Sequence, residues 1–446
     1  MLRSKFRTIL SRQAVLSPDG LLFLFVWAAS FGYANQSGLI APNNQNDLAL
    51  TGSVSRALAL GPFPVLWGVL LALYIIADIW LDGRGQKWGK KIALWSTISG
   101  FVILPAMVAM IYRHDSAPHL YIHDGGIQIE QAARFFLQGQ NPYGVDYSNT
   151  PMAQWAYYDA GVTVNPALFH LTYPPLVWLD TIPFALFFQS LLGWYDVRLV
   201  YLLLLVGSVL LILQSRLFGK NRYSATILLA LNPLFVPFFV EGRNDIVVLF
   251  WLIAALVLLD NEHISWAGLA VAAAVASKQT AWFFVPFFVS YIWACNKNRG
   301  FIAHLKPFLL ALVLLLLVII PFFVWDTHAF LDDIIIYPGA GGGVTNYPIK
   351  SLGLGFWLVE FGVVEHNTDA FPFAWFELLF GVPLFGLLLW VQKKQQALSR
   401  VVMNYALVLV VIMFFSRVFN DNHLGYLITW LGFGFLLNER RSKKNE

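Results

Sequence analysis

The stretch HDGGIQIEQAARFFLQGQNPYG, residues 123–144, is a polar segment between two strongly apolar regions. It begins with His123, Asp124 and a glycine pair, continues as an amphipathic run, and ends in a Gln-Asn-Pro-Tyr turn. A lone Asp in such a segment is ordinarily a solvated loop residue or a helix N-cap. The same carboxylate, held beside an apolar phase, can deprotonate a hydroxyl group as a general base. We therefore take Asp124 as the candidate catalytic residue.

A second group of reactive side chains occupies the short turn Glu241-Gly242-Arg243-Asn244-Asp245. A turn between two apolar runs needs some polar residues. Four hydrogen-bonding side chains in five residues are more than a turn requires. The planar fork of an arginine is a natural bidentate partner for a phosphate. We interpret Arg243, Asn244 and Asp245 as substrate-binding residues.

Two further cations interrupt apolar sequence. Lys278, followed by Gln279, lies between two apolar half-segments, and Arg417 begins the stretch RVFNDNH. A lysine near the end of a span can simply extend its ammonium into the membrane interface. The alternative is that each cation pairs with an anion, and we include Lys278, Gln279 and Arg417 among the substrate-binding residues. The nine histidines show no metal-ligand spacing, and His423 is the one that we add to the binding set.

The composition indicates an integral membrane protein. Only 12% of the 446 residues are charged and 58% are hydrophobic, whereas a soluble domain carries about 25% charged residues. The formal charge of +4 comes from basic residues dispersed at the ends of apolar runs, which excludes a nucleic-acid-binding protein. The single cysteine, Cys295, excludes an intrachain disulfide and a cysteine-based metal site.

Apolar runs long enough to cross roughly 30 Å of hydrocarbon recur along the whole chain. They lie near residues 20–40, 61–81, 92–112, 198–216, 223–240, 246–259, 280–295, 306–325, 372–391, 401–416 and 424–437. We expect the shorter run 265–278 to cross as well, and the run 174–192 to form a juxtamembrane or re-entrant helix on the outer side. The prediction is an all-α polytopic membrane protein with about twelve transmembrane helices.

The distribution of Lys and Arg predicts the orientation. With both termini in the cytoplasm, most of the 29 basic residues fall on the inner side. The outer side then carries the large loop 113–197, the 241–245 turn, the loop 326–371 and the stretch 417–423. An amphipathic helix over about 126–138 is suited to lie in the interface plane and to hold Asp124 at the membrane surface.

Several elements of the sequence occur in an order typical of one group of enzymes. An Asp follows a span and precedes EQAARFFLQGQNPY; then come YPPL, the GRND turn, and Lys-Gln before an apolar segment. Together they resemble the GT-C superfamily of membrane glycosyltransferases, and most of all bacterial glycosyltransferase family 87, the polyprenyl-phosphate-mannose-dependent type. The resemblance covers residues 92–325, about half the chain. Tyr173, which opens YPPL, joins the expected substrate-binding residues.

The resemblance implies a GT-C fold with juxtamembrane helices in the outer loops. Residues 1–91 would form two N-terminal spans, residues 92–325 a catalytic core containing the outer loop 113–197, and residues 326–446 an outer loop and the C-terminal spans.

The resemblance also implies an inverting transfer of a single sugar, a hexose such as mannose. The donor is a polyprenyl-phosphate sugar and the acceptor a glycolipid or glycan on the periplasmic or exterior face of a bacterial plasma membrane. Asp124 is then the base, and Arg243, Lys278 or Arg417 stabilises the leaving phosphate. Relatives that use monophosphate donors work without metal, which favours a reaction with no cofactor. A divalent metal at Asp245 and Glu241 would need the help of Asp124.

A transporter or flippase for lipid-linked sugars is the alternative, because many spans and a few charges at membrane depth fit that class too. Secondary transporters often show inverted repeats and ionisable groups in mid-bilayer. This chain shows no internal repeat, and its unusual charges cluster at one face, with Asp78 as an apparently interfacial exception. These features favour the glycosyltransferase.

Overall fold

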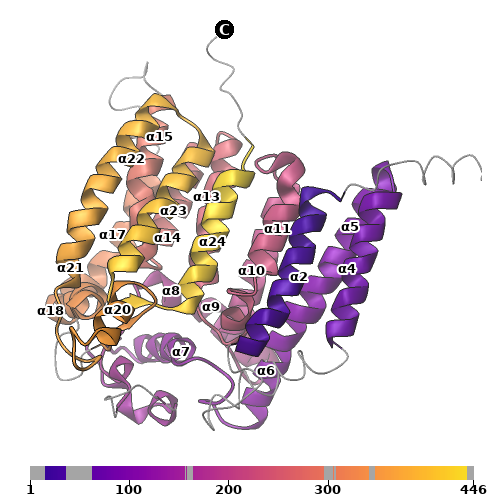
Figure 1. Ribbon diagram of the computed structural model, residues 1–446. Helices are drawn as coiled ribbons and strands as arrows, with labels where there is room; N and C mark the ends of the chain where they lie inside the picture. Colours follow the sequence, from indigo (N-terminus) through magenta and orange to yellow (C-terminus); the bar gives the residue numbers. More distant parts are fainter. Residues whose placement is uncertain are drawn as a thin grey trace, which may run out of the picture.

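A computed structural model describes residues 16–36, 63–155, 157, 164–295, 305, 308–340 and 347–438. The described chain is a bundle of helices that stand side by side (Figure 1). Each predicted apolar run contains a helix. The bundle helices are α2 (Pro18–Gln36), α4 (Phe63–Trp80), α5 (Gly83–Ile98), α6 (Leu104–Asp115), α10 (Arg198–Gln214), α11 (Arg222–Ala230), α13 (Asp245–Asp260), α14 (Ile264–Val275), α15 (Val285–Cys295), α17 (Leu309–Trp325), α22 (Val382–Lys394), α23 (Leu398–Phe415) and α24 (Asp421–Leu436).

Three helices in the described part of the chain are long and apolar enough to cross a membrane by themselves. They are the continuous helix Gly83–Asp115, in which the π-helical turn η2 (Ser99–Ile103) joins α5 to α6, the helix Phe373–Lys394, and α23. A fourth span results if α17 is counted with Thr327–Gly339, to which it is bent by 119°. The prediction of about twelve spans therefore stays a prediction, because the remaining bundle helices are shorter.

The outward faces of the helices are apolar, as a membrane protein requires. Leu317 and Val324 on α17 are 70% and 71% exposed, and Phe435 on α24 is 78% exposed. Large apolar side chains exposed in such numbers are unfavourable in water. The interior is filled by small and aromatic side chains, and α14 contributes a run of buried alanines between α13 and α17. The fold is consistent with a membrane protein.

The run 223–240, expected as one span, is broken in two. Helix α11 ends at Ala230, and the short helix α12 (Val236–Val240) follows after a turn. Asn232 and Pro233 cause the break. The Asn232 side chain accepts a hydrogen bond from the Leu234 N–H at 3.0 Å and donates to the Gly425 carbonyl at 3.0 Å, and a proline has no N–H with which to continue a helix. The run 223–240 is therefore not one continuous helix, and its crossing of the membrane stays a prediction.

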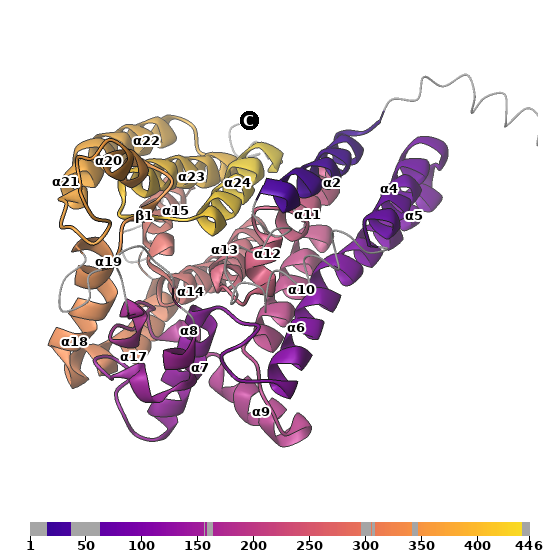
Figure 2. The same ribbon diagram turned by 60° about the horizontal axis from the view of Figure 1, so that its bottom comes forward.

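Helices α2, α4 and α5 form a separate layer at one side of the bundle (Figures 1 and 2). A buried cluster of charges holds them together. The Lys90 ammonium on α5 lies 2.5 Å from carboxylates of both Asp19 on α2 and Asp78 on α4. The Tyr74 hydroxyl donates to Asp19 at 2.5 Å and the Ser17 hydroxyl to Asp78 at 2.5 Å. Asp78 is thus buried in an ion-pair cluster near the end of α4. Its place at the membrane interface stays a prediction.

The expected amphipathic helix is α7 (Asp124–Leu137), which lies across one end of the bundle (Figure 1). It begins at Asp124, earlier than predicted. Most of its residues up to Ala133 are buried against protein, including Gln128 and Gln131. Protein therefore covers most of the first ten residues of α7, and its place in the membrane interface stays a prediction. The helices α8 (Leu176–Leu179) and α9 (Ile182–Leu192) lie toward the same end of the bundle (Figure 2), and α9 has no buried residue.

The segment expected as the loop 326–371 contains several short elements. They are α18 (Thr327–Leu331), the π-helical η9 (Asp332–Ile336), α19 (Tyr337–Ala340), β1 (Lys350–Ser351) and α20 (Leu354–Glu360). Strand β1 pairs in parallel with β2 (Val418–Phe419), with Lys350 opposite Val418. This pairing fixes the segment to the start of α24. Most of the glycine-rich run 339–344 lies outside the described residues.

Candidate active site

A cavity of about 660 Å³ opens where α7, the 241–245 turn and the start of α24 meet. It collects side chains that are far apart in the sequence. All predicted site residues except Arg417 line it: Asp124, Tyr173, Arg243, Asn244, Asp245, Lys278, Gln279 and His423. The volume is in the range of pockets that bind small ligands.

Asp124 is the first residue of α7, and two donors and an imidazole nitrogen surround its carboxylate. The Asn165 amide donates to Oδ2 at 2.8 Å, and the Gly125 N–H donates to Oδ1 at 2.7 Å. The Nδ1 atom of His123, the N-cap of α7, lies 2.8 Å from Oδ1. The positive end of the helix adds to these interactions. They fix the orientation of the carboxylate at the edge of the cavity.

The charge state of Asp124 follows from these contacts. Burial by itself would raise the pKa of Asp124, but the charge and hydrogen bond of His123, with the Asn165 and Gly125 donors, lower the pKa well below its ordinary value. Hydrogen bonds to the charged form of a carboxyl have this effect. The group is therefore an ionised carboxylate at every pH at which the protein is expected to work.

A buried ion-pair network sets the position of α7. Arg113, at the end of α6, makes a bidentate pair with Glu130 of α7 at 2.8 and 2.7 Å. It also contacts Asp196 at 2.8 Å, and Asp196 is held in turn by Arg198 of α10 at 2.7 Å. Arg198 donates to the Tyr121 carbonyl at 2.6 Å, just before the residues that begin α7. Bidentate pairs of this kind fix orientation as well as distance.

The glycine pair after Asp124 is explained by close packing. A Cβ atom on Gly125 would lie 2.6 Å from the Tyr173 hydroxyl, and one on Gly126 would lie 3.3 Å from the Gly242 carbonyl. The His123 N–H donates to the Glu241 carbonyl at 2.7 Å. The start of α7 therefore sits directly against Tyr173 and against the 241–245 turn, which brings the first two predicted motifs into one site.

The cations of the cavity belong to a connected polar network. The Lys278 ammonium forms an ion pair with Asp245 and donates to the Asn244 side chain at 3.0 Å. The Arg243 guanidinium donates to Asn422 Oδ1 at 2.9 Å, and Asn422 donates to Asp245 at 2.8 Å. Both cations remain partly exposed, with side-chain exposures of 14% for Lys278 and 22% for Arg243. They can therefore still reach an anion in the cavity.

His423 lines the cavity without adding a positive charge to it. Burial, together with the nearby cations Lys278 and Arg243, outweighs the charge of Asp245 and lowers the pKa of His423 to about 4. The imidazole is therefore neutral near pH 7. Its Nδ1 accepts a hydrogen bond from the Asn420 N–H at 3.1 Å, as part of the N-terminal cap of α24.

Arg417 is the predicted site residue that the structure places elsewhere. It is 1% exposed and does not line the cavity. Its guanidinium donates to the carbonyls of Tyr347, Asp369 and Asn367. Arg417 therefore holds the residues before and after β1 in place through their carbonyl groups. A sequence shows a cation at this position but not that backbone carbonyls satisfy it.

Three polar atoms on residues that line the cavity have no hydrogen-bond partner within the described part of the chain: the Asn244 amide nitrogen, the Thr280 hydroxyl and the Tyr337 hydroxyl. Asn244 and Tyr337 are 4% and 0% exposed. Buried polar groups are nearly always paired. Unpaired donors on residues that line a cavity are what a binding site for a hydroxyl-rich ligand provides.

The sequence did not point to three of the residues that build the site. Asn165 and Gln128 line the cavity, and the Gln128 amide donates to the carbonyls of Ala167 and His170 at 2.6 and 2.9 Å. This contact holds the loop that carries Asn165. Asn422 joins Arg243 to Asp245. An Asn-Pro pair at 165–166 is an ordinary turn signal, and nothing in the sequence showed that the Asn would face Asp124.

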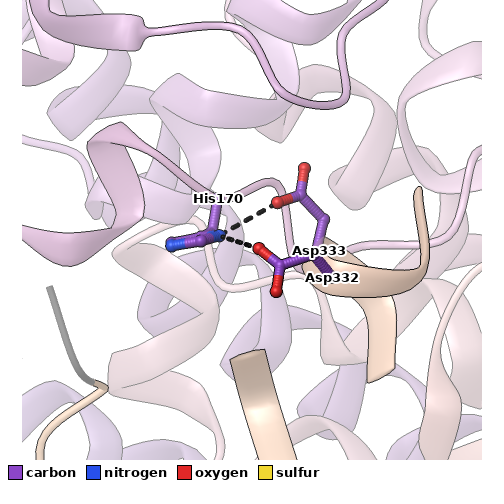
Figure 3. Close-up of side chains that lie close together, drawn as sticks. All are labelled: His170, Asp332 and Asp333. Atoms are coloured by element: carbon purple, nitrogen blue, oxygen red, sulfur yellow. Dashed lines mark hydrogen bonds and ion pairs between the residues drawn. The ribbon is translucent and has the colours of Figure 1, made fainter. Parts of the chain in front are cut away.

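The two carboxylates considered as metal ligands beside Asp124 are engaged by cations of the protein, and only Asp245 of the two lines the cavity. Asp245 is paired with Lys278, and Glu241 lies 3.4 Å from Arg243. Among the residues that the structure describes, one group has the composition and spacing to hold a metal ion: His170, Asp332 and Asp333 (Figure 3). None of these three lines the cavity.

Comparison with known families matches residues 131–294 to the family described as alpha-(1->6)-mannopyranosyltransferase, N-terminal domain. The matched segment is more than a third of the 446 residues. It contains Tyr173, Arg243 and Lys278, whereas Asp124 and His423 lie outside it. No curated protein and no solved structure matches the chain. The family match supports a glycosyltransferase that transfers mannose, of the kind that the sequence resemblance indicates.

Proposed function

We propose that this protein transfers one mannose from a polyprenyl-phosphate donor to a glycolipid or glycan acceptor, with inversion at the anomeric carbon. The reaction takes place in the cavity at the end of the bundle, on the periplasmic or exterior face of a bacterial plasma membrane. Asp124 is the base, and Arg243 and Lys278 receive the phosphate. Arg417 has no part in phosphate binding, because its guanidinium is bonded to backbone carbonyls.

One observation carries the proposal. An oriented carboxylate, Asp124, and two partly exposed cations, Arg243 and Lys278, line the same cavity. A transfer from a sugar phosphate needs both: a group that accepts the acceptor's proton and a positive site for the leaving phosphate. The unpaired Asn244 and Tyr337 donors at the same cavity suit the hydroxyl groups of a sugar.

The bond changes follow from this arrangement. The acceptor oxygen attacks the anomeric carbon while the bond from that carbon to the phosphate oxygen breaks. The hydroxyl proton passes to Asp124, and the lipid phosphate leaves with both bonding electrons. A phosphate leaves without being protonated, so one carboxylate is enough, in contrast to the carboxyl pair of most glycoside hydrolases.

The lowered pKa of Asp124 places a condition on this mechanism. A carboxylate with a low pKa is a weak base toward a resting hydroxyl group. Proton transfer is therefore late. The acceptor hydroxyl becomes acidic only as its oxygen bonds to the anomeric carbon, and Asp124 takes the proton at that stage. Before it, the carboxylate orients the hydroxyl by accepting its hydrogen bond.

The test is a transfer assay with purified protein in lipid nanodiscs. A synthetic polyprenyl-phosphate mannose, labelled in the sugar, is supplied with a glycolipid extract as the acceptor. We expect labelled glycolipid whose new linkage has the anomeric configuration opposite to that of the donor. A nucleotide-linked mannose should not replace the donor. Movement of the intact donor across the membrane of proteoliposomes, with no transfer, would instead identify a flippase.

A further inference from the structure

His170, Asp332 and Asp333 come from two segments that are far apart in the sequence and converge beside the active-site cavity (Figure 3). His170 belongs to the loop before YPPL, and the two aspartates begin the π-helical element η9. The Nδ1 atom of His170 lies 3.1 Å from Asp333 Oδ1 and 3.2 Å from Asp332 Oδ2. Both carboxylates therefore approach the same ring nitrogen.

We propose that these three side chains bind one divalent transition-metal cation, Zn²⁺ or Mn²⁺, which clamps the two segments together. Metal–ligand bonds of about 2.0–2.2 Å place adjacent ligand atoms roughly 3.0–3.4 Å apart. The two nitrogen–oxygen spacings fall in this range. The three ligand atoms all lie within 4.8 Å of one another. The Asp332 side chain is 28% exposed, so an ion held there can be reached from solvent.

Charge balance gives an independent reason for a cation. The Asp333 side chain is 2% exposed, and beyond His170 it accepts only the Gly144 N–H, at 3.2 Å. Asp332 contacts His170 alone, and no Lys or Arg pairs with either carboxylate within the described part of the chain. Even a protonated His170 neutralises only one of the two negative charges. A buried carboxylate without compensation is costly, and a divalent cation removes that cost.

The position of the hydrogen on the His170 imidazole also favours a bound cation. A protonated Nδ1 carries one hydrogen, which cannot point along both lines to two carboxylates at nearly equal distances. A neutral imidazole with its hydrogen on Nε2 directs the Nδ1 lone pair into the space between the carboxylates. A mixed nitrogen and oxygen donor set suits Zn²⁺ and Mn²⁺ better than Ca²⁺, which takes oxygen ligands.

The bound ion would join two segments that contribute to the cavity. The His170 ring is stacked on the ring of Tyr337, with centroids 3.8 Å apart, and the Tyr337 hydroxyl is one of the unpaired donors. The Gln279 amide crosses the same junction, since it donates to the Thr172 carbonyl at 2.7 Å and to the Ile334 carbonyl at 3.1 Å. The metal would thus fix the junction without entering the cavity. The expectation that sugar transfer needs no metal concerns the active-site cavity, which this ion would not enter.

The experiment measures metal content and thermal stability, and needs no substrate. Purified full-length protein is stripped with a chelator, loaded with ZnCl₂ or MnCl₂, desalted, and analysed by elemental mass spectrometry. We expect one bound ion per chain and an unfolding temperature several degrees above that of the stripped protein. Asp332→Asn, which removes a partly exposed ligand, should lower the affinity roughly tenfold or more. Asp333→Asn and His170→Ala should retain no metal.

Asp369→Asn is the matched control. It disrupts an exposed His–Asp pair elsewhere on the surface, in which His366 Nδ1 lies 3.8 Å from Asp369 Oδ2. This variant should bind metal like the wild type. If His170→Ala does not fold, Asp332→Asn and the wild-type titration still decide. A wild type that retains neither ion and shows no thermal shift would overturn the proposal. Equal metal retention by wild type and Asp332→Asn would also overturn it.

Discussion

Two lysines of this protein, the buried Lys90 and the partly exposed Lys278, both pair with carboxylates, yet the regions around them differ in one respect. Lys90 lies in the side layer of α2, α4 and α5, where Asp19 and Asp78 both contact its ammonium. Lys278 lies at the cavity, where it pairs with Asp245 and lines a space of about 660 Å³. The charged groups of the first cluster pair with one another, whereas the second cluster lines the cavity.

The difference separates charges that hold the fold from charges that can do chemistry. In the side layer, Tyr74 donates to the Asp19 oxygen that Lys90 also contacts, and Ser17 donates to the Asp78 oxygen that Lys90 does not contact. The cluster therefore has little capacity for a ligand. At the cavity, Asn244 and Tyr337 keep unpaired donors within the described part of the chain, and Arg243 is partly exposed. Burial of charge alone does not identify a functional site. Burial beside a cavity with unused hydrogen-bonding groups does.

The largest expected effect comes from Asp124→Asn. The amide keeps the shape of the side chain but cannot accept the proton, so transfer should fall by about 10²–10⁴-fold. Donor binding and the unfolding temperature should change little. The measurement is the turnover of labelled donor together with donor affinity. A variant that keeps more than about a tenth of the wild-type rate would remove Asp124 from the role of essential base.

Lys90→Gln should affect stability strongly and chemistry little. Removing the ammonium leaves two buried carboxylates without a cation, and breaking a buried ion pair costs about 3–5 kcal/mol. Thermal unfolding in nanodiscs should show a large decrease in the unfolding temperature. The rate per folded molecule, measured at a temperature at which the variant is folded, should stay near that of the wild type. If Lys90→Gln lowered donor affinity as much as it lowers stability, Lys90 would not serve the fold alone, and the two regions would not differ in function.

The matched substitution Lys278→Gln should show the reverse pattern. The amide can still donate to Asp245 or Asn244, and Asn422 also satisfies Asp245, so stability should fall less than for Lys90→Gln. Donor affinity and turnover should decrease together, roughly tenfold, because the phosphate is charged in both the ground state and the transition state. Normal donor affinity in this variant would mean that Lys278 serves the fold alone.

The smallest effect is expected from Asn165→Asp. The new carboxylate keeps the acceptor that caps Ala167 at 3.0 Å but replaces the amide that donates to Asp124. The pKa of Asp124, now depressed, should rise because a donor is lost and a like charge is added. The acid limb of the profile of kcat/KM against pH should therefore move upward, by about one unit or more. An unchanged limb would show that Asp124 does not control it.

The sequence was sufficient for features that depend on local pattern. The apolar runs became helices, and α7 begins close to the predicted position, with Asp124 in its first turn, where a carboxylate is favourable. The cavity also unites motifs that were separate in the sequence, such as Asp124 and the 241–245 turn, whose roles remain predictions.

What could not be predicted depends on long-range partners. The Asn232–Pro233 break is held by a hydrogen bond to Gly425. Arg417 is satisfied by carbonyls of a distant segment, and the β1–β2 pairing that joins these parts is two residues long. Asp78 shares a cation, Lys90, with Asp19 from another helix. In each case the residue type was visible in the sequence, and the group that satisfies it was not.

The most direct test of the central claim is a structure of the Asp124→Asn protein with the polyprenyl-phosphate mannose donor bound. The account predicts that the phosphate contacts Arg243 and Lys278, and that the anomeric carbon faces the side chain at position 124 with room for an acceptor oxygen between them. A donor phosphate bound outside the cavity would contradict the account. So would a sugar turned away from position 124 while the phosphate occupies the predicted place.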